Sequence, residues 1–157
     1  MSGKIKLEWD IHYVTNGTLT VGNSTFPKYI CDAHTHGLNK LNHPELQLVL
    51  DYGPEEVARL INAVGIMIRK GKTFKNGDKI SGLYEDCDVY IRETDDVNGK
   101  PLLRLVIPDS LNRLPENATE PYSLQMMSTR ILYAMGSADL IHDEHEEPTA
   151  EDNQILS

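Results

Sequence analysis

Residues 53–72 read GPEEVARLINAVGIMIRKGK, and this segment predicts the main helix of the chain. Pro54 at the first turn and the two glutamates after it suit the amino end of a helix, where the backbone dipole favours negative charge. Apolar side chains recur at helical spacing and form one stripe: Val57, Leu60, Ile61, Val64, Met67 and Ile68. Gly71 is a typical C-cap and follows Arg69 and Lys70, at the end of a helix that prefers cations. The segment therefore predicts an amphipathic helix with one buried face.

Two strand patterns open the chain. Residues 5–13 alternate apolar and polar side chains, which is the pattern of a half-buried strand. Asn16-Gly17 is a strong signal for a tight hairpin turn. We therefore expect residues 18–21 to return as a second strand beside the first.

Further strand patterns lie on both sides of the helix. The expected strands cover residues 28–36, 46–52, 88–93 and 102–107. A turn at Asn98-Gly99 joins the last two strands, and a polar loop follows at 108–121. Apolar residues at helical spacing then predict a shorter helix over 123–135. This order predicts an α+β fold: an antiparallel or mixed sheet of about six strands with one main central helix and a shorter C-terminal helix.

Length and charge distribution predict one globular domain followed by a tail. A chain of 157 residues has the size of one domain and can bury a sizeable core. The net charge is −9, and seven acidic residues without any Lys or Arg lie within residues 139–157. Such a charged run is typical of a solvated segment. We therefore assign residues 1–138 to a single globular α+β domain and residues 139–157 to an acidic, disordered tail.

The cysteines and the apolar runs indicate a cytoplasmic protein. Cys31 and Cys87 are too few for a disulfide framework or a zinc ligand set, and we interpret them as reduced thiols. The amino end has no apolar leader, and no apolar run approaches the about 20 residues of a membrane helix. The basic cluster at residues 69–79 contains one aromatic residue, Phe74, which argues against nucleic-acid stacking. Neither a membrane nor a nucleic acid is expected as a partner.

The stretch ICDAHTHGLNKLNHPE, residues 30–45, contains the main candidate metal site. Alternate residues of a strand face the same way, so His34 and His36 should share one face with Asp32. Two neutral imidazoles on one strand can share a metal ion, and the aspartate can orient one of the rings. His43 would supply a third ligand and leave a position for water. The pattern therefore predicts a divalent metal site at His34, His36 and His43.

Two known barrel classes with His-x-His strands are excluded. The Asp-x-His-x-His pattern resembles the first strand of the amidohydrolase barrels, but such a barrel needs about 250 residues. The cupin barrels carry a glutamate where this chain has Lys40 and Leu41. A site of another kind could use Glu45 in place of His43. Without a metal, the strand histidines would hydrogen-bond to neighbours, and His43 would hold the turn before the next strand.

A longer series of short motifs runs through both halves of the chain. It consists of Gly37-Leu38, His43-Pro44-Glu45-Leu46, a helix led by Pro-Glu, RKGKTF at 69–74, Gly77, LVIPD at 105–109 and RLP at 113–115. In order and spacing, these motifs resemble the bacterial domain of unknown function 4262 family over residues 30–127. That family more typically has an aromatic-Thr-aliphatic triplet where this chain has His34-Thr35-His36. The resemblance implies a bacterial protein without an assigned reaction, and fold-level analogy suggests an interaction module.

Two hypotheses for the function follow. The first is a non-enzymatic cytoplasmic domain that contacts a protein partner, because no complete catalytic constellation can be assembled and no cofactor beyond a divalent metal is indicated. The second is a small metal-dependent hydrolase with the His-x-His site. An exposed first strand could also pair across a two-fold axis in a homodimer. The hydrolase hypothesis alone requires that the protein hold a metal ion.

Overall fold

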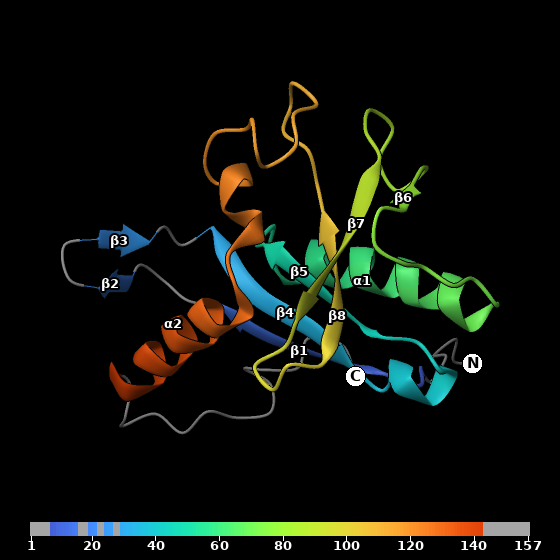
Figure 1. Cartoon of the computed structure of the whole chain (residues 1–157), viewed down its shortest axis with the longest axis horizontal. Helices are drawn as coiled ribbons and strands as arrows, with labels where there is room; N and C mark the ends of the chain where they lie inside the picture. Colours follow the sequence, from blue (N-terminus) through green and yellow to red (C-terminus); the bar gives the residue numbers. More distant parts are fainter. Residues whose placement is uncertain (1–6, 16–18, 22–23, 27–28, 143–157) are drawn as a thin grey trace.

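The computed structural model describes residues 7–15, 19–21, 24–26 and 29–142, with side chains for 7–15 and 29–135. Its centre is a six-stranded sheet (Figure 1). In spatial order the strands are β1 (Asp10–Thr15), β4 (Ile30–His36), β5 (Glu45–Leu50), β8 (Pro101–Val106), β7 (Val89–Asp95) and β6 (Lys79–Ile80). Neighbouring strands are antiparallel except β5 and β8, which are parallel. The expected α+β fold with a mixed sheet is confirmed.

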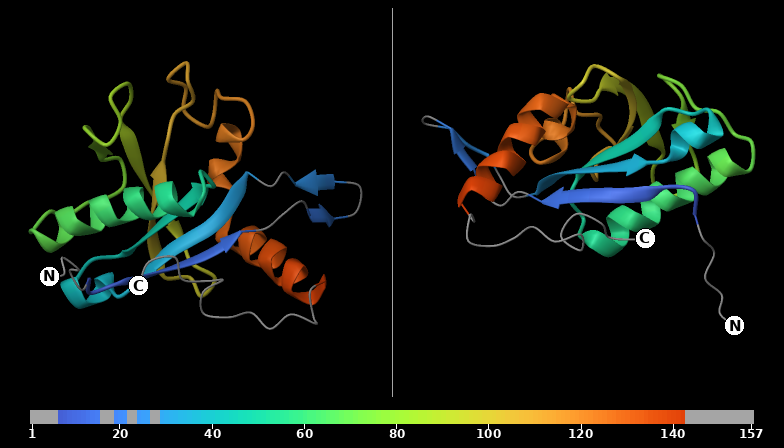
Figure 2. Two further views of the ribbon diagram at one scale, coloured as in Figure 1. Left: turned by 180° about the vertical axis from the view of Figure 1, so that it is seen from behind. Right: turned by 90° about the horizontal axis from the view of Figure 1, so that it is seen from below.

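The helices of the described residues lie on both faces of this sheet. They are the α-helices α1 (Pro54–Arg69) and α2 (Thr129–His142) and the 3-10 helices η1 (Leu38–Leu41) and η2 (Tyr122–Met126). Figure 2 shows α1 on one face of the sheet and α2 on the other. The main helix predicted from residues 53–72 is confirmed. Gly71 follows the end of this helix and has a backbone φ of 111°. No helix among the described residues has the length and apolar character that crossing a lipid bilayer requires.

The larger core lies between α1 and the sheet. Alternate strand residues point toward the helix, so each strand contributes every second side chain. The fully buried members on the strands include Ile11, Ala33, Leu48, Ile91 and Val89. Trp9 packs directly on Gly65 of α1, where a Cβ atom would lie 2.4 Å from the indole ring. The indole N–H donates to Asn62 Oδ1 at 2.9 Å, which fixes the ring against the helix.

The opposite face of the sheet is only partly apolar. A small cluster of Ile30, Val49, Leu132 and Met135 attaches α2 to β4 and β5. Beside this cluster, the same face carries buried polar side chains, which form the candidate site described below.

The predicted pairing of the first two strands is wrong. β1 pairs with β4 along its whole length, from Asp10 opposite His36 to Thr15 opposite Cys31. β2 (Leu19–Val21) pairs instead with β3 (Ser24–Phe26), a strand that was not predicted. The turn at 16–17 lies outside the described residues. β1 pairs with β4 because β4 is long enough to pair with every residue of β1. The buried residues of β4 also belong to the same core as those of β1.

The carboxyl-terminal part also differs from the prediction. Residues 123–135 do not form one helix, because Met127 is extended (φ −57°, ψ 144°) and separates η2 from α2. The Met127 carbonyl accepts a hydrogen bond from Arg104 instead of continuing a helical ladder. α2 reaches His142, past the expected domain boundary at 138. Residues 143–157 of the expected acidic tail lie outside the described residues.

Candidate functional site

One register line across the sheet carries polar side chains on the face away from α1. Backbone pairing places each member opposite the next on five adjacent strands. We call this set the polar row: His12, His34, Gln47, Arg104 and Arg92. Gln47 and Arg104 are 0% and 1% exposed, so their polar atoms must find partners inside the protein.

Three histidines meet at the β1 end of the polar row. His12 and His34 are opposite each other, and His36 lies two residues further along β4 on the same face. The ring centroids of His12 and His36 are 4.5 Å apart, and those of His12 and His34 are 5.5 Å apart. One ring nitrogen of each lies within 4.8 Å of the other two. Metal–nitrogen bonds of about 2.1 Å would bring these nitrogens to about 3.4 Å, a change that side-chain rotation can supply.

Asp32 fixes the orientation of His34. Asp32 Oδ1 lies 3.0 Å from His34 Nδ1 and accepts a second hydrogen bond from Gln47 Nε2 at 3.0 Å. Because an ionised carboxylate only accepts, Nδ1 carries the proton and Nε2 of the neutral ring keeps the lone pair. Carboxylate–histidine pairs of this kind hold metal-binding imidazoles in place.

The surroundings separate the pKa values of the histidines. Burial lowers the pKa of His12, and the neighbouring His36 and His34 lower it further. Burial would also lower the pKa of His34, but the hydrogen bond and charge of Asp32 outweigh it and raise that pKa. In the same pair, burial opposes ionisation of Asp32, and the hydrogen bond from His34 still lowers the pKa of Asp32. His34 therefore stays protonated to higher pH than His12, which is the more available neutral ligand.

The buried middle of the polar row connects the histidines to the segment before α2. Arg104 Nε donates to Gln47 Oε1 at 2.9 Å. Nη1 donates to the carbonyls of Gln125 and Met127 at 2.8 and 2.6 Å. Nη2 donates to Thr129 Oγ1 at 3.2 Å. Burial lowers the pKa of Arg104 to about 10, so it remains charged at neutral pH and braces η2 and the start of α2 against the sheet.

A pocket of about 530 Å³ adjoins His34 and His36. His34 and His36 line it from β4, and Lys100 and Leu102 line it from the β7–β8 turn and β8. Tyr133 of α2 forms part of the remaining wall. This volume lies in the range of small-molecule sites.

His43 lines the same pocket as His34 and His36 but does not belong to the group of three neighbouring ring nitrogens. It is 4% exposed and both of its ring nitrogens are bonded within the fold. Nδ1 donates to the Pro44 carbonyl at 2.8 Å, and Nε2 accepts from the Phe74 amide at 3.0 Å. His43 therefore links the turn before β5 to the segment after α1.

Glu45, the alternative third ligand, is engaged as well. Its Oε1 accepts from Thr35 Oγ1 at 2.6 Å and from the Leu38 amide at 3.1 Å. Its Oε2 accepts from the amides of Gly37 and Asn39 at 3.2 and 3.3 Å. These four bonds hold the η1 turn, so the carboxylate acts as an internal acceptor.

His12 is the histidine that sequence reasoning missed. The alternation of residues 5–13 correctly put His12 on the polar face of its strand. Only the pairing of β1 with β4 brings it opposite His34, and the expected hairpin with 18–21 concealed that pairing.

Comparisons with protein-family models, with curated proteins and with solved structures find no match to this chain.

Proposed function

We propose that this protein is a small metal-dependent hydrolase that binds a divalent transition-metal ion through His12, His34 and His36. The observation that supports the proposal is the approach of three ring nitrogens to within 4.8 Å of one another on two adjacent strands. The hydrogen bond from His34 to Asp32 adds the orienting group that such ligands use. Imidazole ligands suit zinc, copper, iron and nickel, so one of these ions is expected.

The sheet supports a site that needs little rearrangement. His12 and His34 belong to one hydrogen-bonded pair of strands, which fixes the distance between their backbones. Three protein ligands leave a fourth position for water, as in catalytic zinc sites. A metal held there would lower the pKa of its water and supply a nucleophile at neutral pH.

The adjoining pocket supports a small substrate. His34 and His36 line its wall, so a molecule in the pocket would lie beside the proposed metal position. Lys100 lines the same pocket beside the carboxylates of Asp32, Glu45 and Asp96, so its wall can contact polar groups of either charge. Leu102 and Pro101 add apolar surface for the rest of such a molecule.

The test compares two histidine variants of the same chemical change. His12→Gln and His43→Gln each remove one imidazole, and both are made with His142 and His145 of the tail replaced by glutamine. Each protein, prepared without an affinity tag, is loaded with zinc or cobalt and dialysed, and its metal content is measured by mass spectrometry. We expect about one ion per chain in the parent and in His43→Gln, and a loss in His12→Gln and in His34→Ala/His36→Ala.

The same variants distinguish an error in the proposed ligand set from an error in the proposed function. Loss of metal in His43→Gln with retention in His12→Gln would restore the ligand set expected from the sequence and contradict the one proposed here. Absence of metal from the parent would remove the proposal altogether. If the metal binds as expected, hydrolysis of a panel of activated esters and phosphate esters is compared between the parent and His12→Gln.

A protein-interaction role is the second candidate. In the described part of the chain β1 pairs on one side only, which supports a homodimer through its free edge. The free thiols of Cys31 and Cys87 support a cytoplasmic location. We also propose that the chain belongs to the bacterial domain of unknown function 4262 family. The order of its motifs over residues 30–127 supports this membership. Light scattering of the full chain tests the dimer, and a monomer mass would contradict it.

A further inference from the structure

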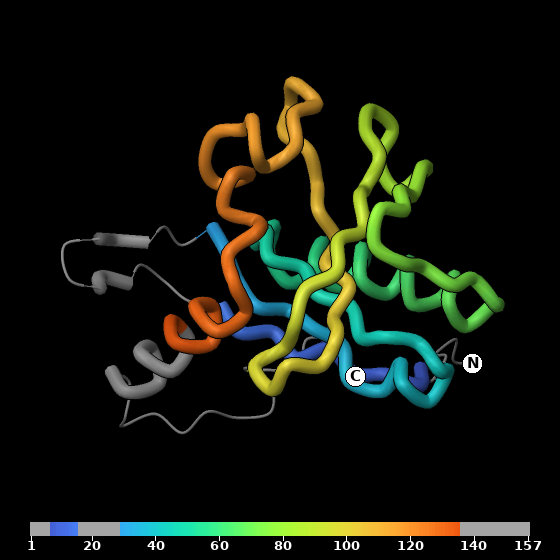
Figure 3. The backbone as a smooth tube through the Cα atoms, viewed as in Figure 1, coloured from blue at the N-terminus to red at the C-terminus, as the bar shows by residue number. Residues whose placement is uncertain are grey.

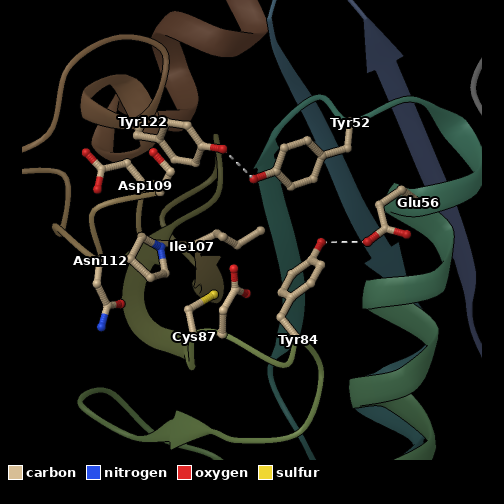
Figure 4. A pocket seen from close by; sticks show the side chains of 11 residues that line it. Tyr52, Glu56, Tyr84, Cys87, Ile107, Asp109, Asn112 and Tyr122 are labelled. Atoms are coloured by element: carbon tan, nitrogen blue, oxygen red, sulfur yellow. Dashed lines mark hydrogen bonds between the residues drawn. The ribbon is translucent and has the colours of Figure 1, made fainter.

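A second cavity of about 480 Å³ shares no lining residue with the histidine pocket. It lies where the loop between β6 and β7 and the loop after β8 project from the same end of the fold (Figure 3). We call it the tyrosine cleft, because Tyr52, Tyr84 and Tyr122 line it from three separate segments. Figure 4 shows Tyr52 and Tyr84 on one side of the cleft and Tyr122 on the other, next to Asp109.

Hydrogen bonds hold these rings in place. Tyr84 donates its hydroxyl to Glu56 Oε2 at 2.6 Å, and the hydroxyls of Tyr52 and Tyr122 share a bond of 3.1 Å (Figure 4). A phenol that donates to a carboxylate has a more electron-rich ring, which strengthens its attraction for cations. Arg59 Cζ lies 5.4 Å from the centroid of the Tyr84 ring, so a guanidinium already covers one face of this ring.

The charges of the tyrosine cleft also favour a cation. Its lining contains Glu56, Asp86 and Asp109, and no Lys, Arg or His. Glu56 is paired with Arg59 and Asp109 with Arg113. The Asp86 carboxylate has no bonding partner among the described residues. The cleft therefore offers aromatic faces and one uncompensated negative charge.

We propose that the tyrosine cleft binds a small soluble organic cation with an alkylated ammonium group. Aromatic rings that line one cavity are the arrangement that recognises such cations, and the acidic lining adds to the attraction. The cavity of about 480 Å³ has the size of a small-molecule site and would hold the ammonium group with an attached chain. The proposal is independent of the metal site, because the two cavities have no residue in common.

The test uses choline as the probe and 3,3-dimethyl-1-butanol, which has the same shape without the charge, as its control. Binding to the full chain is followed by nuclear magnetic resonance titration. We expect choline to bind and the neutral alcohol not to bind. Asp86→Asn should weaken choline about threefold, and Tyr122→Leu about fivefold, the range of one cation–π contact. Tyr122→Phe, which keeps the ring, should bind nearly as the parent does.

Glu85→Gln is the matched control for charge. Glu85 is exposed and adjacent to Asp86 in sequence, but it does not line the tyrosine cleft. It should therefore leave choline binding nearly unchanged. Equal binding of the neutral alcohol, or equal weakening by Glu85→Gln and Asp86→Asn, would overturn the proposal. Binding to phosphatidylcholine vesicles or to a trimethyllysine peptide without binding of free choline would overturn it in favour of a lipid or protein partner.

Discussion

Arg104 and Arg92 stand opposite each other in the polar row, yet their surroundings predict different costs of removal. Arg104 is buried and donates to four groups, so Arg104→Met leaves one buried and one partly buried carbonyl without a donor. We expect the free energy of unfolding to fall by about 3 kcal/mol, as when one partner of a buried charged network is lost. Urea denaturation of the variant measures this loss.

Arg92→Met is the matched control. Arg92 pairs with Glu116, which is exposed, and such pairs contribute about 0–1 kcal/mol. A similar loss of stability in both variants would contradict the bracing role of Arg104. Arg104→Lys tests the fork geometry, because one ammonium group cannot reach acceptors on β5, η2 and α2 together.

The histidines should titrate at different pH in chelator-treated protein. Nuclear magnetic resonance titration of the imidazole protons is expected to give a pKa for His34 above, and for His12 below, that of an unperturbed histidine. Asp32→Asn should lower the pKa of His34, because the carboxylate raises it. His36→Ala should raise the pKa of His12, because the positive charge of His36 lowers it. A His34 pKa unchanged by Asp32→Asn would refute the pairing.

The pair of His34 and Asp32 makes the stability of the fold depend on pH. The raised pKa of His34 contributes stability that is fully present below about pH 6.5 and is lost as pH rises through the folded-state pKa. The lowered pKa of Asp32 contributes stability that is present above about pH 3.9 and is lost as pH falls. The melting temperatures of the parent and Asp32→Asn should therefore differ most between these limits. The difference should shrink as pH rises through the folded-state pKa of His34, and it should be smallest at pH values below the folded-state pKa of Asp32.

At the scale of elements, the contact between α1 and Trp9 predicts an unusual effect of alanine in a helix. Replacing glycine by alanine inside a helix normally stabilises it by about 1 kcal/mol. At Gly65 the new methyl would lie 2.4 Å from a ring that Asn62 holds in place, and overpacking costs about 1–3 kcal/mol. We expect Gly65→Ala to lower the melting temperature in thermal denaturation.

A double-mutant cycle with Trp9→Phe isolates that contact. The smaller ring leaves room for the methyl, so Gly65→Ala should cost less stability in the Trp9→Phe background. Equal costs in the two backgrounds would show that the contact with Trp9 is not the cause.

The elements differ in how well the sequence predicts them, and the reason is the range of their interactions. α1 follows from local spacing and from Pro54 at its start, and its predicted limits agree with Pro54–Arg69. The partner of β1 is a long-range choice, which no local signal contains. The break at Met127 has the same origin, because Arg104 takes its carbonyl. His34 and His36 could be found from their spacing, whereas His12 needed the strand pairing.

At the scale of the whole molecule, the proposed metal should stabilise the fold. Its ligands come from β1 and β4, so an ion that binds only the folded state raises the free energy of unfolding by about 2.7 kcal/mol at 100 times its dissociation constant. The melting temperature of the parent should rise with added zinc and return after a chelator. His12→Gln should show no such rise, and an equal rise in that variant would mean that zinc binds elsewhere.

The single parallel pairing in the described sheet has a consequence for the order of folding. Strands on each side of β5 and β8 pair with near neighbours in the chain, whereas Gln47 and Arg104 meet across 57 positions. Such a junction closes a long loop and is expected to form late. All three histidines precede this junction in the chain, while the pocket beside them needs the β7–β8 turn and α2. During synthesis, an ion could therefore reach its ligands from open solvent before the pocket beside His34 and His36 has formed.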